Sequence, residues 1–409
     1  MSVTWVLAWR NLWRHRRRTW LTVGAMVFCN ILLVFLVSLQ FGAYQMMIDG
    51  SLAAYTGHIQ IQKQGYLDDQ YIYQSVPEVS GLASQLRADP GVEAVAARAE
   101  AFALASSAER SFGILLTGVQ PAYEPGVSTF PGKLLDGRYL DNDDAQEIVI
   151  GVVLAQNLKV GVGDELTFLG SGRDGSFAAA VATVVGILDT GLEEVDRSMA
   201  QVPLGWFQQV FSMGDQGHSV VIRLPSLERV PAVTATLRDQ VQNRDGLTVL
   251  DWDALMPGLR QAISSDMAGA WFQYGILVLL VAFSVLNTQL MSVLERTREF
   301  GVMLSLGFRP QRLARLVAME TLLMALLGLV LGMIGGGLLS WYLSHAGFSY
   351  PGMEEMAARF MLPDRMYPEV SLFSMSLGPL AVFGGAMLAT LYPALRLFRL
   401  QPIAAMRAA

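Results

Sequence analysis

The sequence contains one cysteine, Cys29, among its 409 residues, so no disulfide can form within the chain. Cys29 lies in an apolar run, where a small buried hydrophobic side chain is the expected role. Charged residues are also scarce: they make up 16% of the chain, whereas 53% is hydrophobic. That balance excludes an ordinary soluble protein of this length, and it leaves too much charge for a protein made only of membrane spans.

The motifs of common catalytic sites are absent as well. The sequence has no Gly-x-x-x-x-Gly-Lys-Ser/Thr string, which excludes a P-loop ATPase within it, and it has no HExxH or GxSxG string. Its histidines are scattered over different parts of the chain, at His15, His58, His218 and His345. A metal site built from them is not expected. We therefore expect a chain that is not an enzyme and that binds no cofactor, no metal and no nucleic acid.

The charges that are present are unevenly distributed. Residues 44–265 hold 27 of the 35 acidic residues but only 14 of the 29 basic ones, a balance of −13. The remainder of the chain holds 8 acidic and 15 basic residues, a balance of +7. This pattern predicts an acidic, mostly soluble block that is inserted into a basic membrane frame. With no disulfide available, the block must be held together by a packed core.

Four apolar runs are long enough to cross a bilayer. We expect spans at residues 19–43, 266–294, 313–344 and 372–395. The first run has a competing interpretation as a cleaved signal peptide, because a basic start precedes it. The apolar stretch from Trp20 to Phe41 is longer than the core of a signal peptide, and no A-x-A-like cleavage site follows it. An uncleaved first span, with the N-terminus in the cytoplasm, is the preferred prediction.

Residues 1–18 combine indoles with guanidinium groups at helical spacing. This composition is typical of an amphipathic helix that lies on the cytoplasmic face of the membrane, with indoles at its boundary and guanidiniums on anionic lipid. The predicted anchor residues are Trp5, Trp9, Trp13, Arg14, Arg16, Arg17 and Arg18.

Residues 295–312, ERTREFGVMLSLGFRPQR, form a short charged segment between the second and third runs. Its arginines favour the cytoplasmic side of the membrane. Glu295 and Glu299 are one helical turn apart, and Gly307 is expected to end the helix before Pro310. One interpretation is a small helix across the cytoplasmic face that docks into the groove of a partner. The other is an ordinary solvated loop.

The string ERTREFGVMLSLG within this segment resembles the signature of the FtsX-like permease family. Members of that family are the membrane subunits of MacB-type and lipoprotein-releasing (LolC/LolE-type) ABC transporters. The resemblance implies that the segment is the coupling helix that contacts the ATPase subunit, which would hold the ATP and Mg. The residues assigned to this interface are Glu295, Arg296, Arg298, Glu299, Phe300, Met303, Leu304 and Gly307.

The block at residues 44–265 alternates helix and strand signals. The string GHIQIQ at residues 57–62 has the period of two that predicts a half-exposed strand, and it is similar to the start of the outer domain of LolC/LolE-like permeases. The later order of strands and helices resembles the MacB-like periplasmic core. We therefore expect an α+β periplasmic domain, with a second small lobe near residues 120–205.

The third span is rich in glycine, which lets helices approach closely inside a bilayer. The predicted packing residues are Gly328, Gly332, Gly335 and Gly336.

The second span contains several polar side chains, for which hydrogen bonds between helices are favoured over a substrate role: Gln273, Asn287, Thr288 and Gln289. Glu320, near the cytoplasmic end of the third span, is expected to be structural. Residues 345–371 are expected to form a periplasmic loop, and residues 396–409 a basic cytoplasmic tail similar to that of the family.

The fold expected from these patterns is an α-helical membrane protein with four transmembrane helices plus a large α+β periplasmic domain, MacB-like, inserted between the first and second helices. It would lie in the bacterial inner membrane with both termini in the cytoplasm. The resemblance implies an ABC ATPase dimer, a second permease copy or paralogue, and a periplasmic chaperone, adaptor or lipoprotein as partners. Release of lipoprotein by mechanotransmission is the leading function. Efflux of a drug, peptide or toxin, and regulation of a cell-wall hydrolase without transport, remain alternatives.

Overall fold

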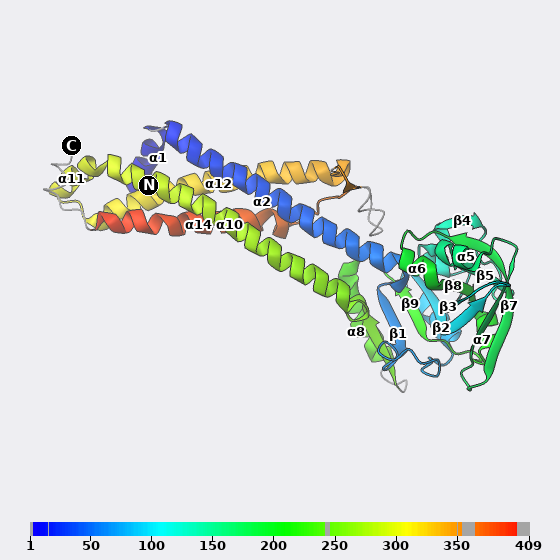
Figure 1. Ribbon diagram of the computed structural model, residues 1–409. Helices are drawn as coiled ribbons and strands as arrows, with labels where there is room; N and C mark the ends of the chain where they lie inside the picture. The colour runs from blue at the N-terminus through cyan, green and yellow to red at the C-terminus, as the bar shows by residue number, and fades with distance from the viewer. Residues whose placement is uncertain (1–2, 15, 242–245, 350, 354–364, 399–409) are drawn as a thin grey trace. The chain divides into compact units, whose positions relative to one another are not determined.

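The computed structural model describes residues 3–14, 16–241, 246–349, 351–353 and 365–398. The chain divides into two compact units. The helical unit consists of residues 1–46, 262–351 and 365–409, and the sheet unit consists of residues 47–261 and 352–364. Each unit is described by itself (Figure 1). The predicted tail at 399–409 and the part of the predicted loop at 354–364 lie outside the described residues.

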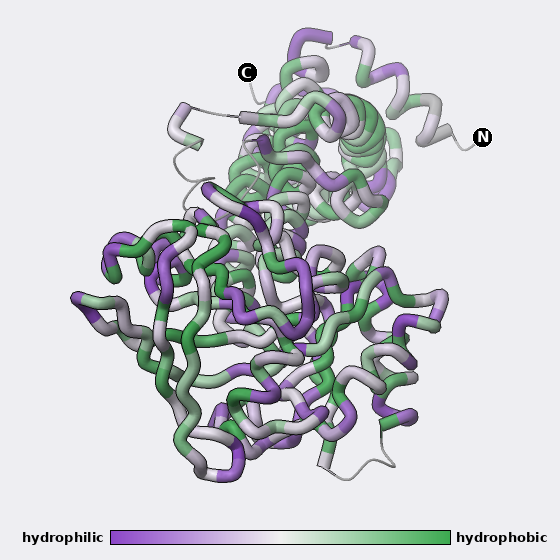
Figure 2. The backbone as a smooth tube through the Cα atoms, turned by 90° about the vertical axis from the view of Figure 1, so that its right-hand side faces the viewer, coloured by the Kyte–Doolittle hydropathy of each residue, from purple (hydrophilic) through white to green (hydrophobic). Residues whose placement is uncertain are grey.

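Among the described residues, four helices are long and apolar enough to cross a membrane, as the sequence predicts, and hydrophobic residues dominate them in the tube view (Figure 2). The helices of this part of the chain are α1 (Val3–Arg14), α2 (Arg16–Ser51), α10 (Pro257–Glu295), α11 (Thr297–Ser305), α12 (Pro310–Ala346) and α14 (Leu372–Leu397). The first two long helices extend beyond the predicted span boundaries, because α2 continues to Ser51 and α10 already begins at Pro257.

The structure describes helices on both sides of His15, which lies outside the described residues: α1 ends at Arg14 and α2 begins at Arg16. Arg16, Arg17 and Arg18 are helical and lie in the first turn of α2 as it is described.

The sheet unit is built on a single ten-stranded sheet. Its order is β10-β1-β9-β2-β3-β8-β5-β7-β4, and β6 pairs with both β2 and β7. The pairs β3/β8 and β5/β7 are parallel, and the others are antiparallel. The strands are β1 (Ile59–Lys63), β2 (Ala94–Ser106), β3 (Ser111–Val119), β4 (Leu134–Gly137), β5 (Glu147–Gly151), β6 (Glu165–Ser171), β7 (Phe177–Leu188), β8 (Met199–Pro203), β9 (Ser219–Arg223) and β10 (Leu247–Asp251).

Short helices connect these strands and complete an α+β fold, as predicted. The α-helices are α3 (Val79–Arg87), α4 (Glu124–Val127), α5 (Val152–Leu158), α6 (Glu193–Ser198), α7 (Leu204–Val210), α8 (Val230–Val241) and α9 (Trp252–Leu255). A π-helix, η1 (Leu52–Thr56), precedes β1, and 3-10 turns occur at η2 (Phe130–Gly132) and η3 (Leu227–Arg229).

One large apolar core runs along the sheet and includes residues from β1, β2, β5, β7 and α7. The strands β4 to β8, which the sequence assigns to a separate small lobe, join the same sheet. They retain a second apolar cluster of their own, built around Phe130, Val149 and Leu188. The expected lobe is therefore one end of a continuous sheet.

Candidate functional site

The segment between the second and third long helices forms a compact elbow, which we define as residues 295–310. Its central part is the helix α11, so the sequence prediction of a short helix agrees with the structure. The helix is followed by Gly307 at φ +91°, a conformation that side-chain-bearing residues rarely adopt. Pro310 then occupies the first turn of α12, where its fixed φ suits a helix start and no amide proton is needed.

Two residues that the sequence assigns to a partner-facing surface face inward instead. Phe300 is fully buried and packs in an apolar cluster with Val293, Leu313 and Val317, from α10 and α12. Arg296 is also buried, and its guanidinium lies 4.9 Å from the centre of the Phe300 ring. The reason is that a nine-residue helix has to bury one face to be held in place, and that face contains Phe300.

A buried polar network fixes Arg296. Its Nη1 donates to both carboxylate oxygens of Glu320 on α12, at 3.0 and 3.2 Å, and its Nε donates to Glu299 Oε2 at 3.2 Å. Asn11 on α1 donates from Nδ2 to Glu320 Oε1 at 2.7 Å. The charge of Glu320 is thus compensated by Arg296 and by a neutral donor, as a buried carboxylate requires.

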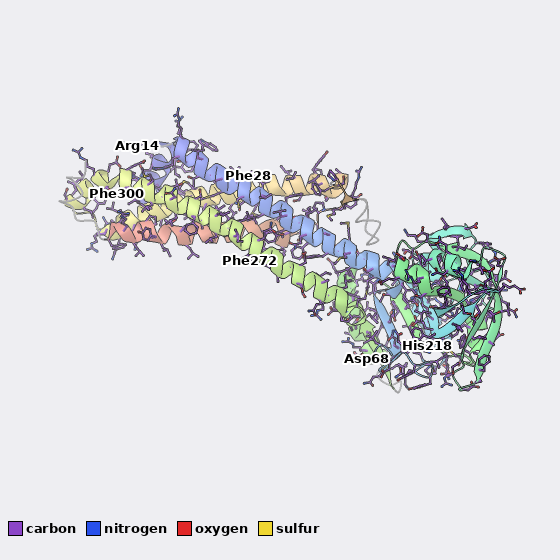
Figure 3. The ribbon with its side chains drawn as sticks, in the orientation of Figure 1. Arg14, Phe28, Asp68, His218, Phe272 and Phe300 are labelled. Atoms are coloured by element: carbon purple, nitrogen blue, oxygen red, sulfur yellow. The ribbon has the colours of Figure 1, made fainter. Side chains whose placement is uncertain are left out.

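The start of the chain also contacts the elbow through exposed ion pairs. Arg14 Nη1 lies 3.3 Å from Glu299 Oε1, and Arg18 Nη1 lies 3.0 Å from Glu295 Oε2. Arg18 in addition donates from Nη2 to Ser292 Oγ at 2.8 Å. Arg14, from α1, and the elbow are found at the same end of the helical unit (Figure 3). Two arginines predicted as lipid anchors therefore contact the elbow. These contacts could not be predicted from a local pattern, because the partners are more than 270 residues apart.

The outward face of the elbow is apolar. Val302 and Phe308 are 44% and 43% exposed, and Leu306 is 75% exposed. Arg298, one turn before Val302, is also exposed, whereas Met303 and Leu304 are half-buried against the inner cluster. Sequence reasoning missed Val302, Leu306 and Phe308, although the spacing of four residues from Arg298 to Val302 to Leu306 was a signal for one helix face. These three apolar side chains are therefore exposed together on the elbow.

Glycines bring α12 against α2. A Cβ atom placed on Gly328 would lie 2.8 Å from Met26 Cβ, and one on Gly332 would lie 2.3 Å from Asn30 Cβ. A Cβ atom placed on Gly335 would lie 2.8 Å from Ile31 Cδ1, and one on Gly336 would lie 2.7 Å from Val34 Cβ. These distances are shorter than real Cβ contacts. The four predicted packing glycines therefore lie in one seam between these two helices.

The polar residues of the second span do not all lie between helices. Gln289 is buried, and Thr288 donates to the Ser284 carbonyl of its own helix at 2.9 Å. Gln273 and Asn287, in contrast, are exposed on α10. An amide in hydrocarbon without a partner is costly, so Gln273 and Asn287 stand out as polar positions on an exposed part of an apolar helix.

The sheet unit contains buried charges, but their partners are other protein groups. Arg98 and Glu124 are both buried and paired at 2.5 Å, and Arg98 also donates from Nη1 to the Tyr55 carbonyl at 2.6 Å. Burial lowers the pKa of His218, whose Nδ1 accepts from the Glu100 amide at 2.8 Å. Among the residues that the structure describes, no three histidine, cysteine, aspartate or glutamate side chains form a metal-binding group. The buried charges of Arg98 and Glu124 are thus satisfied by each other and by the backbone.

Comparisons with known proteins match both parts of the chain. The family model of the MacB-like periplasmic core domain matches residues 19–240, and that of the FtsX-like permease C-terminal domain matches residues 271–402. The lipoprotein-releasing system transmembrane protein LolC of Neisseria meningitidis is 24% identical over 326 residues, 78% of either chain. LolC of Xylella fastidiosa is 27% identical over 334 residues, again 78% of either chain.

Solved structures with similarity to this chain cover about half of it. The periplasmic region of MacB from Actinobacillus actinomycetemcomitans is 16% identical, with a TM-score of 0.38, and the match covers 51% of this chain and 94% of that one. The extracellular domain of the transporter YknZ from Gram-positive bacteria is 19% identical, with a TM-score of 0.36, and the match covers 48% of this chain and 100% of that one.

Proposed function

This chain belongs to the FtsX-like permeases that contain a MacB-like periplasmic core domain, and we propose that it couples ATP hydrolysis in a separate ATPase subunit to movement of its periplasmic domain. It is an ABC transporter permease of the LolC/MacB type. The proposed cargo is a lipoprotein or another lipid-linked molecule in the bacterial inner membrane. The proposed topology has both termini in the cytoplasm and the sheet unit in the periplasm.

The outward face of the elbow is the observation that supports an ATPase partner most directly. Leu306 and its neighbours Val302 and Phe308 expose apolar side chains beside the exposed guanidinium of Arg298. Behind them, Phe300 and the buried Arg296 attach the helix to α10 and α12. The inner face of this helix is fixed by contacts with α10 and α12, and its outer face offers apolar side chains to a partner. This arrangement suits a docked ATPase subunit that displaces the helix. ATP and Mg would be bound by that partner.

The length of two helices supports the mechanotransmission part of the proposal. α10, which ends at the elbow, is one helix of 39 residues, and α2 is one helix of 36 residues. A continuous α-helix has all its backbone hydrogen bonds in place and transmits a displacement as a rigid element. The glycine seam at Gly328 to Gly336 gives α2 and α12 close contact, so these two helices would move together.

A second permease copy or a paralogue is proposed to cover the exposed face of α10. Gln273 and Asn287 on that face are exposed amides in an apolar helix. Fourteen residues separate them, close to four full turns, so they project from similar sides of the helix. A neighbouring helix would supply hydrogen-bond partners that lipid tails lack.

The cargo is assigned from the relatives named lipoprotein-releasing system proteins, at 24% and 27% identity. Two other functions are compatible with the same fold: efflux of a drug, peptide or toxin with a periplasmic adaptor, and regulation of a cell-wall hydrolase. Copurification from native membranes separates them. A lipoprotein or its chaperone supports the proposal, whereas an adaptor with an outer-membrane channel, or a hydrolase, would replace it.

The docking assignment is tested by site-specific crosslinking. A photoreactive amino acid at Leu306 should crosslink to the ATPase subunit, and one at Phe28, which is 70% exposed on α2, should not. Leu306→Asp should weaken ATPase binding by about tenfold or more, because it places a charge in an apolar contact. Normal ATPase binding by Leu306→Asp, with no crosslink from position 306, would reject the elbow as the docking site.

A further inference from the structure

An apolar hollow opens between α1, α2 and α12 in the helical unit. Indoles form its rim: the ring of Trp13 lies edge-on to Trp9, with centroids 6.0 Å apart, and to Trp20, with centroids 6.4 Å apart. Leu327 and Leu331, one turn apart on α12, line the opposite wall. The hollow holds about 540 Å³ of space, including its open mouth.

The surroundings of the hollow are those of a membrane interface. Trp20 is 57% exposed, and Leu21, beside it in α2, is 76% exposed, so this surface of the helix is in contact with whatever surrounds the protein. In a bilayer, the apolar part of this surface would contact the hydrocarbon tails of lipids. Indoles concentrate at the level of the lipid headgroups. The hollow therefore opens where an acyl chain passes beneath its headgroup.

Unpaired positive charge is found at the mouth of the same hollow. Arg16 lines it, and its Nε donates to the Trp13 carbonyl at 3.4 Å, which keeps the guanidinium at the rim. Within the described part of the chain, no carboxylate lies within ion-pair distance of Arg10, Arg16 or Arg17. This contrasts with Arg14 and Arg18, which pair with glutamates of the elbow. A guanidinium with free N–H groups matches the paired oxygens of a phosphate.

We propose that this hollow is a binding site for one anionic diacyl phospholipid, with an acyl chain between the indoles and α12 and the phosphate on Arg16. The occupant is a lipid and not a protein segment, because the wall is apolar, the mouth is cationic, and two of the helices that form it, α2 and α12, are long and apolar enough to cross a membrane. The proposal goes beyond transport and depends only on insertion of the helical unit into a bilayer.

The acyl-chain part is tested by native mass spectrometry of the full-length protein in detergent with added phosphatidylglycerol. Leu327→Trp fills the hollow and should abolish retention of the most tightly bound lipid. Leu338→Trp is the matched control, because Leu338 lies on the same helix, is 62% exposed and is not part of the hollow. If Leu327→Trp does not give a monodisperse protein, Leu331→Trp fills the same space one turn along α12. Equal lipid retention by the filled and control variants would overturn the site.

The headgroup part is tested with phosphatidylglycerol and phosphatidylcholine in competition. Arg16→Gln should reduce the preference for phosphatidylglycerol by about fivefold, the effect of one basic charge near an anionic lipid. Arg309→Gln removes an exposed charge from the elbow and should leave the preference unchanged. If wild type shows no preference between the two lipids, the site does not select anionic lipid and the proposal fails. An unchanged preference in Arg16→Gln would exclude Arg16 as the phosphate ligand.

Discussion

Arg296 and Glu320 form a two-pronged contact, 3.0 and 3.2 Å from Nη1 to the two carboxylate oxygens, at a site where both side chains are less than one tenth exposed. The contact joins Arg296, the first residue after α10, to Glu320, a buried residue of α12. It makes the position of the elbow depend on a charge pair within the helical unit.

Removing one partner of this pair should release the elbow. Glu320→Ala leaves the buried Arg296 with only the more exposed Glu299 as an ion-pair partner. Breaking a buried pair costs up to about 3–5 kcal/mol. We expect hydrogen exchange of α11 to accelerate strongly in this variant. Glu295→Ala removes a pair that is largely exposed and should cost about 1 kcal/mol or less. Similar protection of α11 in the two variants would show that the buried pair does not hold the elbow.

The glycine seam should not accept a methyl group at its tightest point. Gly332→Ala places a Cβ atom at 2.3 Å from Asn30 Cβ, so α2 and α12 must separate, and overpacking of this kind costs about 1–3 kcal/mol. The expected result is a lower melting temperature of the full-length protein in one fixed detergent. Gly384→Ala on α14 meets no atom within 4 Å and serves as the control. A melting temperature that is unchanged in Gly332→Ala would contradict the close approach of the two helices.

The sheet unit should lose stability in mild acid. His218 is fully buried, its Nε2 lies 3.0 Å from the Ile72 carbonyl, and burial lowers its pKa from the ordinary value of 6.5. Burial also lowers the pKa of His58. As pH falls below 6.5, the unfolded chain binds protons that the folded unit does not bind, so the free energy of unfolding decreases until the lowered folded pKa is reached. Above pH 6.5 these groups contribute no pH dependence.

The measurement is hydrogen exchange of β9 in the full-length protein at several pH values, with correction for the intrinsic exchange rate. His218→Gln has no group that titrates at this position and should show a shallower decrease of stability between neutral and acid pH. An identical pH dependence in wild type and His218→Gln would assign the acid sensitivity to other groups.

The membrane topology has a direct test. A reporter inserted after Gln70, in the loop that follows β1, should be periplasmic, and a reporter fused to the C-terminus at Ala409 should be cytoplasmic. The arginines of the elbow and of the N-terminal helix predict this orientation. If the two reporters exchange sides, the elbow faces the periplasm and cannot bind a cytoplasmic ATPase.

Periodicity and local residue preference were sufficient for much of this fold. The four long helices follow from apolar runs, and α5 follows from a short apolar segment after a strand. The alternation at residues 57–62 correctly predicts the strand β1, but the strand is not half-exposed as expected, because Gln60 and Gln62 are buried as well. The end of the elbow follows from Gly307 and Pro310, which act through their own backbone preferences. Features of this kind are local, so a single sequence contains them.

The two faces of the elbow could not be predicted in the same way. In α11 both Phe300/Leu304 and Val302/Leu306 repeat every four residues, so the period alone does not say which pair is buried. The buried side is defined by contacts with other helices: Arg296 donates to Glu320, 24 residues away, and Phe300 packs against Leu313 and Val317. A prediction from one sequence does not contain these contacts, because the partners lie on another helix.

The pairing of β1 with β10 places Ile59 opposite Asp251. β1 is the first strand of the sheet unit and β10 is its last strand. The two are neighbours and form one antiparallel ladder. A domain whose two ends are adjacent can be gained or lost between two helices without rearranging them. The geometry of this ladder therefore lets the sheet unit differ in length without a change in the spacing between the strands at which the chain enters and leaves it.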